Sequence, residues 1–418
     1  MNLFSKRLDR WALRFGLAAA LIGAAAEGGS AQWTVTRLHP AGESVSRAYG
    51  VSGGQQVGEA NDDVDNIPHA SLWSGTAASW VDLHTPGHFR SYANGVFGGQ
   101  QVGTAHPDFA HASMWSGTAA SRVDLHPMTA DVVNSYGNAI SAGQQVGYTS
   151  WDSGQQHAAL WTGSAASWVD LNPPGATGSR ANGVSDGQQV GDAYLVGGQG
   201  ESHASLWSGT PASWVDLNPA SASQSTAKGV SGGQQVGNSF VNGAFHASLW
   251  SGTAASWVDL QPAGAERSYA NGVFAGQQVG FVALVGGADH ASLWSGSAAS
   301  WVDLHAFVPA EFEQSYAQSI WSDASFTYVA GYGFSALTRS DEALLWVRAA
   351  PACCAGDFNG DNVVTNADIP GFVAALLAGA VCPAPPACCS GDFNGDGKVN
   401  GADLPGFLAK LLAGGACP

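Results

Sequence analysis

Short runs in which apolar and polar residues alternate recur along this chain, and turns rich in Gly and Ser separate them. In the run 69–73, Ala70 and Leu72 face one side of an extended segment and Trp73 faces the other, which is the period of a β-strand. Each repeat holds four such pieces, of the forms Ala-Asn-Gly-Val, Gln-Gln-Val-Gly, His-Ala-Ser-Leu-Trp and Trp-Val-Asp-Leu. The pattern predicts many short strands joined by tight turns.

The four pieces recur with a nearly fixed period. The first five spacings between successive Gln-Gln-Val-Gly elements are 45, 44, 44, 46 and 43 residues. Such a period indicates an array of structural repeats, and four antiparallel strands per repeat fit a propeller blade better than a helical solenoid. The valines of this element are Val57, Val102, Val146, Val190, Val236 and Val279, with Val329 in a worn seventh copy.

The number of strands predicts how the array closes. The third strand occurs seven times, ending at Trp73 in the first repeat and at Trp346 in the last, but the fourth strand follows only six of them. The segment 35–38, before the first repeat, has the form of the missing fourth strand. We therefore predict a ring of seven blades in which residues 35–38 pair beside Ala343 to Trp346, which covers both open edges.

Composition agrees with a protein built from strands and turns. Gly contributes 56 of the 418 residues and charged residues only 11%, which is poor material for long charged helices. Hydrophobic residues make up 45%, so there is ample apolar surface to bury. The net charge of −17 argues against binding to nucleic acid or to an anionic membrane.

The N-terminus has the form of a secretory signal peptide. Lys6, Arg7, Arg10 and Arg14 precede an apolar run, 15–26, that is too short to span a bilayer. Cleavage before Gln32 follows from the small residues around it, and cleavage after Ala26 is an alternative, as is an uncleaved anchor. No later apolar run is long enough to cross a membrane. We expect a secreted protein, extracellular or at the cell surface.

The recurring forms Ala-Asn-Gly-Val, Gln-Gln-Val-Gly and His-Ala-Ser-Leu-Trp-Ser-Gly resemble the bacterial extracellular HAF repeats, a family named for a His-Ala-Phe tripeptide. Here the third residue is usually Ser followed by Leu. The resemblance covers residues 33 to about 348 and implies a secreted, β-propeller-like protein. It implies no particular activity.

Three residue types recur at equivalent positions of the repeats. Imidazoles are common ligands of transition metals, but one His per blade should be spread around the ring. We therefore expect each His to bond a backbone group or an Asp of its own blade, and we expect the Trp residues to pack between blades, with a subset on one rim that could stack on sugars. The His residues are His69, His111, His157, His203, His246 and His290, with Glu342 in the seventh repeat; the Asp residues are Asp82, Asp124, Asp170, Asp216, Asp259 and Asp303.

Departures from the repeat are better places to look for function. The acidic loop Asn61 to Asn66 is a weak cation site or a solvated turn, and Glu311 and Glu313 lie in a long insertion of the seventh repeat. The sequence contains no Gly-x-Ser-x-Gly, Walker loop or His-Glu-x-x-His motif.

The C-terminal region consists of two near copies offset by 35 residues, each with an Asp-x-Asn-x-Asp loop followed by an expected helix, at 372–377 and 407–412. Side-chain oxygens at loop positions 1, 3, 5 and 12, with a backbone carbonyl at position 7, suit a hard cation such as Ca²⁺, and position 9 can act through water. The expected ligands of two Ca²⁺ ions are Asp357, Asn359, Asp361, Val363, Thr365 and Asp368 in the first loop, and Asp392, Asn394, Asp396, Lys398, Asn400 and Asp403 in the second.

Two such loops, each followed by one helix, resemble a type I dockerin over about 65 residues. The resemblance implies calcium binding and docking to a cohesin domain, often in polysaccharide-degrading assemblies. Loop positions 10 and 11 commonly carry a Ser-Thr pair in that family, whereas here they are Asn366-Ala367 and Gly401-Ala402.

All the cysteines lie in this C-terminal region, at matching places in both copies. In a secreted chain they indicate disulfides. Copy symmetry suggests one bridge within each copy and one between copies, among the 15 possible connectivities. The cysteines are Cys353, Cys354, Cys382, Cys388, Cys389 and Cys417.

The sequence thus predicts a signal peptide over residues 1–31, a seven-bladed propeller over 32–349 and a small helical calcium-loop domain over 350–418. The expected role is binding or display at the cell surface or in an extracellular complex, with a cohesin-like protein or surface component as partner of the tail and a glycan on the propeller. The alternative is a glycan hydrolase or lyase, which would need a carboxylate pair or a Tyr/His cluster in one cleft that breaks the sevenfold pattern.

Overall fold

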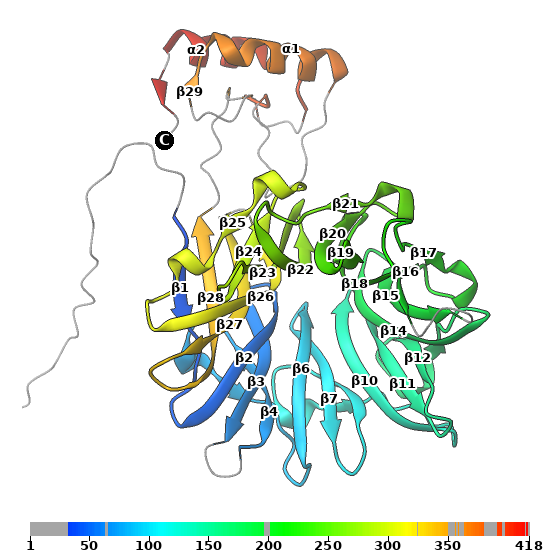
Figure 1. The fold of residues 1–418 in the computed structure, drawn as a ribbon. Coiled ribbons are helices and arrows are strands. Elements are labelled where there is room, and N and C mark those ends of the chain that lie inside the picture. Colours follow the sequence, from blue (N-terminus) through cyan, green and yellow to red (C-terminus); the bar gives the residue numbers. More distant parts are fainter. Residues whose placement is uncertain are drawn as a thin grey trace, which may run out of the picture.

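The computed structural model describes residues 32–62, 66–195, 201–323, 325–349, 356, 358, 363–379, 391–394, 398–413 and 415–416. The expected signal peptide lies outside these residues. Between residues 34 and 349 the chain forms seven four-stranded antiparallel sheets that follow one another around an axis. The fold is a mainly β, seven-bladed propeller, as the repeat predicts (Figure 1).

Six blades are continuous in sequence, and each is ordered from an inner to an outer strand. Blade 1 contains β2 (Glu43–Ser52), β3 (Gln55–Asp62), β4 (Pro68–Trp73) and β5 (Val81–Asp82); blade 2 contains β6 (Arg90–Phe97), β7 (Gln100–His106), β8 (His111–Trp115) and β9 (Val123–Asp124); blade 3 contains β10 (Val132–Ser141), β11 (Gln144–Trp151), β12 (Gln156–Trp161) and β13 (Val169–Asp170). Blade 4 contains β14 (Ala176–Ser185), β15 (Gln188–Leu195), β16 (Ser202–Trp207) and β17 (Val215–Asp216); blade 5 contains β18 (Gln224–Ser231), β19 (Gln234–Val241), β20 (Ala244–Trp250) and β21 (Val258–Asp259); blade 6 contains β22 (Ala265–Phe274), β23 (Gln277–Leu284), β24 (Asp289–Trp294) and β25 (Val302–Asp303).

Blade 7 is completed by the N-terminal strand. It contains β26 (Phe312–Ser322), β27 (Phe326–Ser335) and β28 (Ser340–Ala349), and its outer strand is β1 (Thr34–Arg37). Val35 pairs with Trp346 in an antiparallel register, and the next residue after β1, Leu38, donates its N–H to the carbonyl of Ala343 at 2.8 Å. The predicted closure of the ring is confirmed.

The propeller has two unlike faces. The turn face is formed by the connections from the inner to the second strand and from the third to the outer strand. The loop face is formed by the connections from the second to the third strand and from the outer strand to the next blade. The turns before the outer strands hold short 3₁₀ helices, which the sequence suggested only as turns. These are η1 (Ala77–Ser79), η2 (Ala119–Ser121), η3 (Ala165–Ser167), η4 (Pro211–Ser213), η5 (Ala254–Ser256) and η6 (Ala298–Ser300); η7 (His305–Phe307) follows β25.

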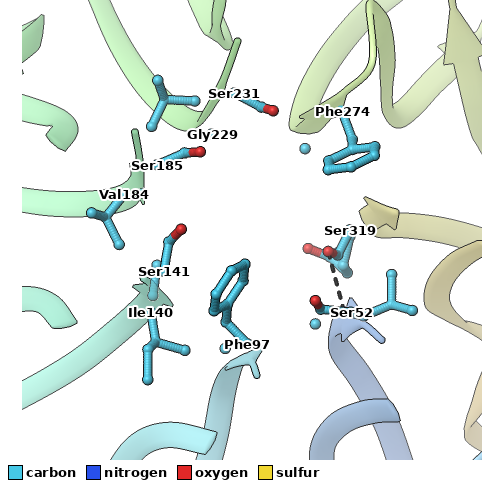
Figure 2. Close-up of a pocket in the computed structure, with 18 of the residues that line it drawn as sticks. Ser52, Phe97, Ile140, Ser141, Val184, Ser185, Gly229, Ser231, Phe274 and Ser319 are labelled. Carbon is cyan, nitrogen blue, oxygen red and sulfur yellow. Dashed lines mark hydrogen bonds between the residues drawn. The ribbon is translucent and has the colours of Figure 1, made fainter. Parts of the chain in front are cut away.

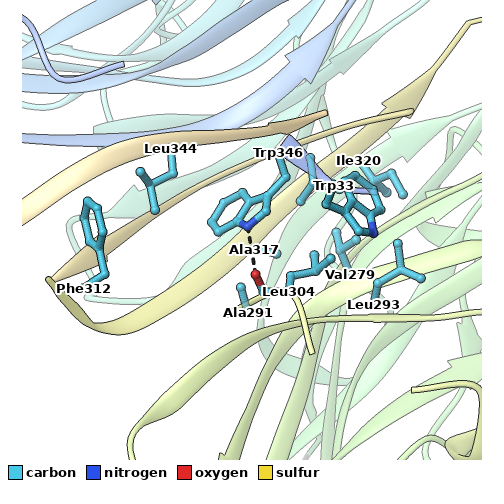
Figure 3. Close-up of a cluster of buried hydrophobic side chains, with 11 residues drawn as sticks. Trp33, Val279, Ala291, Leu293, Leu304, Phe312, Ala317, Ile320, Leu344 and Trp346 are labelled. Carbon is cyan, nitrogen blue, oxygen red and sulfur yellow. Dashed lines mark hydrogen bonds between the residues drawn. The ribbon is translucent and has the colours of Figure 1, made fainter. Parts of the chain in front are cut away.

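The hydrophobic core lies between neighbouring blades. Trp115 of blade 2, which is fully buried, packs in one cluster with Val57, Leu72 and Leu83 of blade 1. Burying an aromatic side chain of this size removes ~150–250 Å² from water, so each such Trp joins two sheets. Figure 3 shows the cluster between blades 6 and 7, where Trp346 donates its indole N–H to the carbonyl of Leu304.

The glycine of the Gln-Gln-Val-Gly element is required by a close approach of two backbones. A Cβ on Gly103 would lie 1.9 Å from the carbonyl oxygen of Tyr92 on the neighbouring inner strand. The pairing of these strands shifts register between Ala93 and Gly95, which is the mark of a β-bulge. Any side chain at this glycine would break the hairpin.

The described part of the C-terminal region contains two helices that are longer than the sequence predicts, α1 (Ile369–Ala378) and α2 (Leu404–Ala413). Phe372 of α1 stacks on Phe407 of α2 with ring centroids 4.0 Å apart, and both are buried. Its other elements are β29 (Val363–Val364), η8 (Asn366–Asp368) and β30 (Gly415–Ala416). Within the described residues, no helix is long and apolar enough to cross a membrane.

Candidate functional site

Each repeated His is bonded to the repeated Asp of its own blade. In blade 3, His157 Nδ1 donates to Asp170 Oδ2 at 2.7 Å, and the other Asp oxygen accepts the backbone N–H of Asn172 at 2.8 Å. The same His–Asp contact occurs in blades 1 to 6 at 2.7–3.1 Å. The predicted bond is confirmed, and the His residues lie one per blade instead of meeting at one place.

One serine per blade fastens that blade to the previous one. Ser91 of β6 accepts the backbone N–H of Ala70 in blade 1 at 2.9 Å and contacts His84 Nδ1 at 2.9 Å. The equivalent serines, which we call the latch serines, are Ser46, Ser91, Ser135, Ser179, Ser225, Ser268 and Ser315. Because these hydrogen bonds are buried and recur at every blade interface, the repeated polar residues are scaffold.

A cavity of about 220 Å³ lies on the axis and is lined by the inner strands of all seven blades. Along its wall the side chains of Asn94, Asn138, Asn182 and Asn271 donate to a carbonyl of the following blade at 2.8–3.0 Å. The equivalent positions of the other blades hold Tyr49, Lys228 and Gln318. The channel wall therefore combines a repeated amide ring with three departures from it.

Two of the departures lie close to a buried carboxylate. Burial lowers the pKa of Lys228, although Asp192 opposes that effect. Burial raises the pKa of Asp192, which also accepts a hydrogen bond from Asn182 at 3.2 Å. Tyr49 donates its hydroxyl to Glu59 at 2.9 Å, and burial together with Glu59 raises its pKa, so that its hydroxyl stays protonated.

The turn-face mouth of this channel is formed by four serines, Ser52 among them, and three aromatic residues. Figure 2 shows Ser141, Ser185 and Ser231 of consecutive blades on one side of the opening, with Phe97 and Phe274 at the equivalent positions of other blades. Trp321 takes this position in blade 7 and stacks on Tyr328 with ring centroids 5.7 Å apart. The opening thus offers hydrogen-bonding groups and flat apolar surfaces to one small ligand.

The loop-face ends of the inner strands carry a second ring of variable residues. The residue after each latch serine is Arg47, Tyr92, Tyr136, Arg180, Thr226, Tyr269 or Tyr316. The residue paired with each of these on the second strand is Glu59, Thr104, Tyr148, Asp192, Asn238, Phe281 or Tyr332, respectively. We call these two sets the rim positions. Sequence reasoning missed them, although the variable residue after a constant serine was a visible signal.

The rim is most polar between blades 7 and 1. Arg47 bonds Glu59 at 2.7 Å and Asp341 at 2.7 Å, and its guanidinium lies 5.6 Å from the ring centroid of Tyr332. Burial works against the charged form of Arg47, yet its hydrogen bond to Asp341 and the nearby carboxylate of Glu59 raise its pKa overall. This group of charges is internally paired and fixed in orientation.

The departures singled out from the sequence have other surroundings. Glu311 contacts Arg37 of β1 and so belongs to the closure of the ring, while Glu313 is exposed. Within the acidic loop, Asn61 bonds the side chain of Asn66 at 3.1 Å, and residues 63–65 lie outside the described part. Among the described Trp residues, Trp151 and Trp321 are partly exposed, and Trp321 lies at the turn-face mouth.

The two expected calcium loops are described in part. Asp368 is buried and accepts the N–H of Phe358 at 2.7 Å and of Thr365 at 2.8 Å; Asp403 does the same for Phe393 at 2.8 Å and Asn400 at 2.9 Å. Both loops are thus closed in the same way from position 12. Val363 lies in β29, and Asp392, Asn394 and Lys398 are among the described residues. The described donors are oxygens, the ligand type that Ca²⁺ takes.

Several predicted residues fall outside the described part of the chain. Asp357, Asn359, Asp361 and Asp396 of the calcium loops are among them, and so is every cysteine expected in a disulfide. Their predicted roles stay predictions.

The fold and its axial cavity define the class of this molecule as a seven-bladed β-propeller whose inner strands all line one cavity on the axis. No protein-family model matches the chain. No curated protein matches it either.

Solved structures share the fold at low sequence identity. A puromycin hydrolase, solved as the S511A mutant complexed with PGG, matches with a TM-score of 0.50 and 10% identity over 74% of this chain and 56% of its own. A puromycin-hydrolyzing peptidase of Mycobacterium tuberculosis matches with a TM-score of 0.50 and 11% identity over 75% and 55%. An oligogalacturonate lyase in complex with manganese matches with a TM-score of 0.47 and 9% identity over 78% and 99%. The match spans little more than half of the two hydrolases, and at these identities the likeness is one of fold alone.

Proposed function

We propose that the protein is a secreted binding protein in which the propeller takes a ligand at the variable positions around its axis and the C-terminal region, loaded with Ca²⁺, attaches the molecule to a cell-surface or extracellular assembly. The single observation that supports a binding role is the division of the repeat into constant and variable positions. The residues that join strands and blades recur in nearly every copy, whereas the rim positions and the turn-face mouth differ from blade to blade. A scaffold with varied side chains around one axis is suited to recognition.

The tail supports attachment through its two similar loops. Gly371 and Gly406 let each helix approach the Phe at loop position 2, because a Cβ on either glycine would lie 2.5 Å from the Cβ of that Phe. We propose that the twelve oxygen donors predicted from the sequence bind two Ca²⁺ ions, and that the region acts as a dockerin-like module for a cohesin-like or surface partner. Lys398 would contribute only its backbone carbonyl.

Polysaccharides test the role of the propeller. The secreted chain is screened against neutral and anionic polysaccharides, and each is scored for retention of the protein and for release of reducing ends. Retention without release supports a binding protein. Release of reducing ends would replace our proposal by the hydrolase or lyase alternative, and neither retention nor release would contradict both.

Calcium stoichiometry tests the role of the tail. Calorimetry on the full chain should give two Ca²⁺ ions, and Asp392→Ala with Asp396→Ala should leave one. A chain ending at residue 349 is the control and should bind none. Two ions that persist in the double variant, or none in the full chain, would contradict the proposal.

A further inference from the structure

We propose that the loop-face rim binds a neutral polysaccharide chain along an arc of aromatic rings that runs from blade 5 to blade 1. This inference rests on the proposed binding role and adds the site and the ligand class.

The arc is continuous across four blades. Successive ring centroids lie 4.7–6.5 Å apart. The first ring lies on a third strand, and the following rings alternate between inner and second strands. In order around the axis the rings are Phe245, Tyr269, Phe281, Tyr316, Tyr332 and Tyr49. A run of rings of this kind is longer than one sugar unit, so its occupant is a chain.

The rings of the arc differ from the aromatic core. The Trp at the end of each third strand is fully buried, whereas every ring of the arc is partly exposed. The rings pack face to face in the pairs Tyr269–Phe281 and Tyr316–Tyr332, so the surface that they leave partly exposed is mainly their edges and hydroxyl groups, which can contact the C–H and O–H groups of a sugar chain. Unlike the buried Trp residues, the rings of the arc are therefore not fully covered by a neighbouring blade.

Polar groups beside the rings suit hydroxyls. Tyr316 donates its hydroxyl to Asp289 at 2.9 Å, and Arg267 pairs with the same carboxylate at 3.1 Å. Arg47 holds Glu59 and Asp341 in the same manner at the other end of the arc. Each carboxylate and guanidinium has hydrogen-bonding capacity beyond its partner, so neighbouring hydroxyls of a sugar can accept from one and donate to the other.

The charges of the arc argue for a neutral ligand. The arc has three carboxylates for two arginines, so it carries no excess of positive charge that would attract an anionic chain. The protein carries a net charge of −17, which disfavours polyanions such as nucleic acid or polyuronates. A neutral polyhydroxylated chain can use the aromatic and hydrogen-bonding groups without electrostatic repulsion.

The test is affinity electrophoresis of the full chain in gels that contain xyloglucan, galactomannan or mixed-linkage β-glucan, with polygalacturonate and alginate as anionic probes. We expect retardation by at least one neutral probe. The double variant Tyr269→Ala/Tyr316→Ala should weaken it roughly tenfold, because two rings of the arc are removed.

The matched control changes the preceding residue of each strand, Ser268→Ala/Ser315→Ala. These latch serines point away from the arc, so this variant should unfold more readily but bind within about twofold of the wild type. Equal retardation of the wild type and the tyrosine variant would contradict the arc but leave the proposed binding role intact. Retardation by the anionic probes alone would have the same two consequences. Retention of the wild type by none of the probes would contradict both the arc and the binding role.

Discussion

At the residue scale, adjacent positions of one strand have different surroundings, and we assign the first to the scaffold and the second to the proposed binding surface. On β22, Ser268 accepts the N–H of Ala247 across the blade interface at 2.9 Å, whereas Tyr269, on the opposite side of the strand, contacts Phe245 and Phe281. The serine recurs in every blade, and the second residue is Tyr, Arg or Thr. A change at the first position should therefore act on stability and a change at the second on binding.

Blade 3 lacks one hydrogen bond that other blades have. In blades 1, 4, 5 and 6 the indole N–H of the Trp before the outer strand donates to a Ser at 2.9 Å. Trp168 has a buried N–H with no acceptor among the described residues, because Ala159 takes the place of that Ser. We predict that Ala159→Ser stabilises the propeller by about 1 kcal/mol.

Chemical denaturation checks this prediction, and Ser205→Ala in blade 4 is the reciprocal control, which should destabilise by a similar amount. A destabilised Ala159→Ser variant would show that blade 3 is packed unlike its neighbours.

His106 should make stability depend on pH. Burial, with smaller contributions from Arg90 and His111, lowers the pKa of His106 from 6.5 to about 4. The unfolded chain therefore takes up a proton before the folded chain does, and this contribution to stability is lost as the pH falls from about 6.5 to about 4. We predict that the thermal midpoint of His106→Gln falls less than that of the wild type between pH 7 and pH 4.5. Equal changes of the thermal midpoint with pH in the two proteins would contradict the prediction.

Local periodicity made the strands predictable from the sequence, but it did not make the contacts between blades predictable. The alternation of residues in Gln-Gln-Val-Gly and His-Ala-Ser-Leu-Trp, and the turn residues beside them, indicate strands. The four-stranded repeat could therefore be predicted from the sequence. The bond from Ala70 to Ser91 joins two repeats, and its partner becomes visible only once the blades are placed. The rim positions were not predicted for the same reason: Tyr269 and Tyr316 are 47 positions apart in the chain and come onto one rim only when the blades surround the axis.

At the element scale, β1 is matched to blade 7 by a reversed pair of charges. Glu342 takes the position of the repeated His, and Arg37 takes the position of the repeated Asp. Arg37 Nε lies 3.6 Å from Glu342 Oε2, and Glu342 is buried. An Asp-bearing outer strand would place two carboxylates together in this blade, so the reversal favours β1 over the other outer strands. Trp33, just before β1, is buried against Val279 and Leu293 of blade 6 and reinforces the closure.

Exchange of the charges tests this match. In a Glu311→Gln background, which removes the other acidic neighbour of Arg37, we predict that Arg37→Asp destabilises the ring by about 3 kcal/mol, since Glu342 stays buried and loses its cation. Adding Glu342→His restores the His–Asp pair of the other six blades and should recover most of the loss. Thermal unfolding measures both steps, and a double exchange no more stable than the single one would contradict the account.

At the scale of the whole molecule, a closed ring makes one surface out of seven unlike inner strands. Closure through β1 leaves blade 7 with four strands like the others, so the axis is surrounded on all sides. Residues far apart in sequence, such as Arg47 and Tyr332, then meet at one rim. The sequence predicted the ring and the tail's loops, and the place where a ligand would sit emerges only from the assembled ring.

Hydroxyl-radical footprinting of the full chain, with and without a retained neutral polysaccharide, tests most directly where that ligand sits. Tyrosine rings that are partly exposed react readily, and a bound chain shields them. The account predicts slower oxidation of Tyr269, Tyr316 and Tyr332, with Phe97 and Phe274 of the turn-face mouth unchanged. Protection confined to the turn-face mouth or to the C-terminal region, with the loop-face tyrosines oxidised at their free rate, would contradict it.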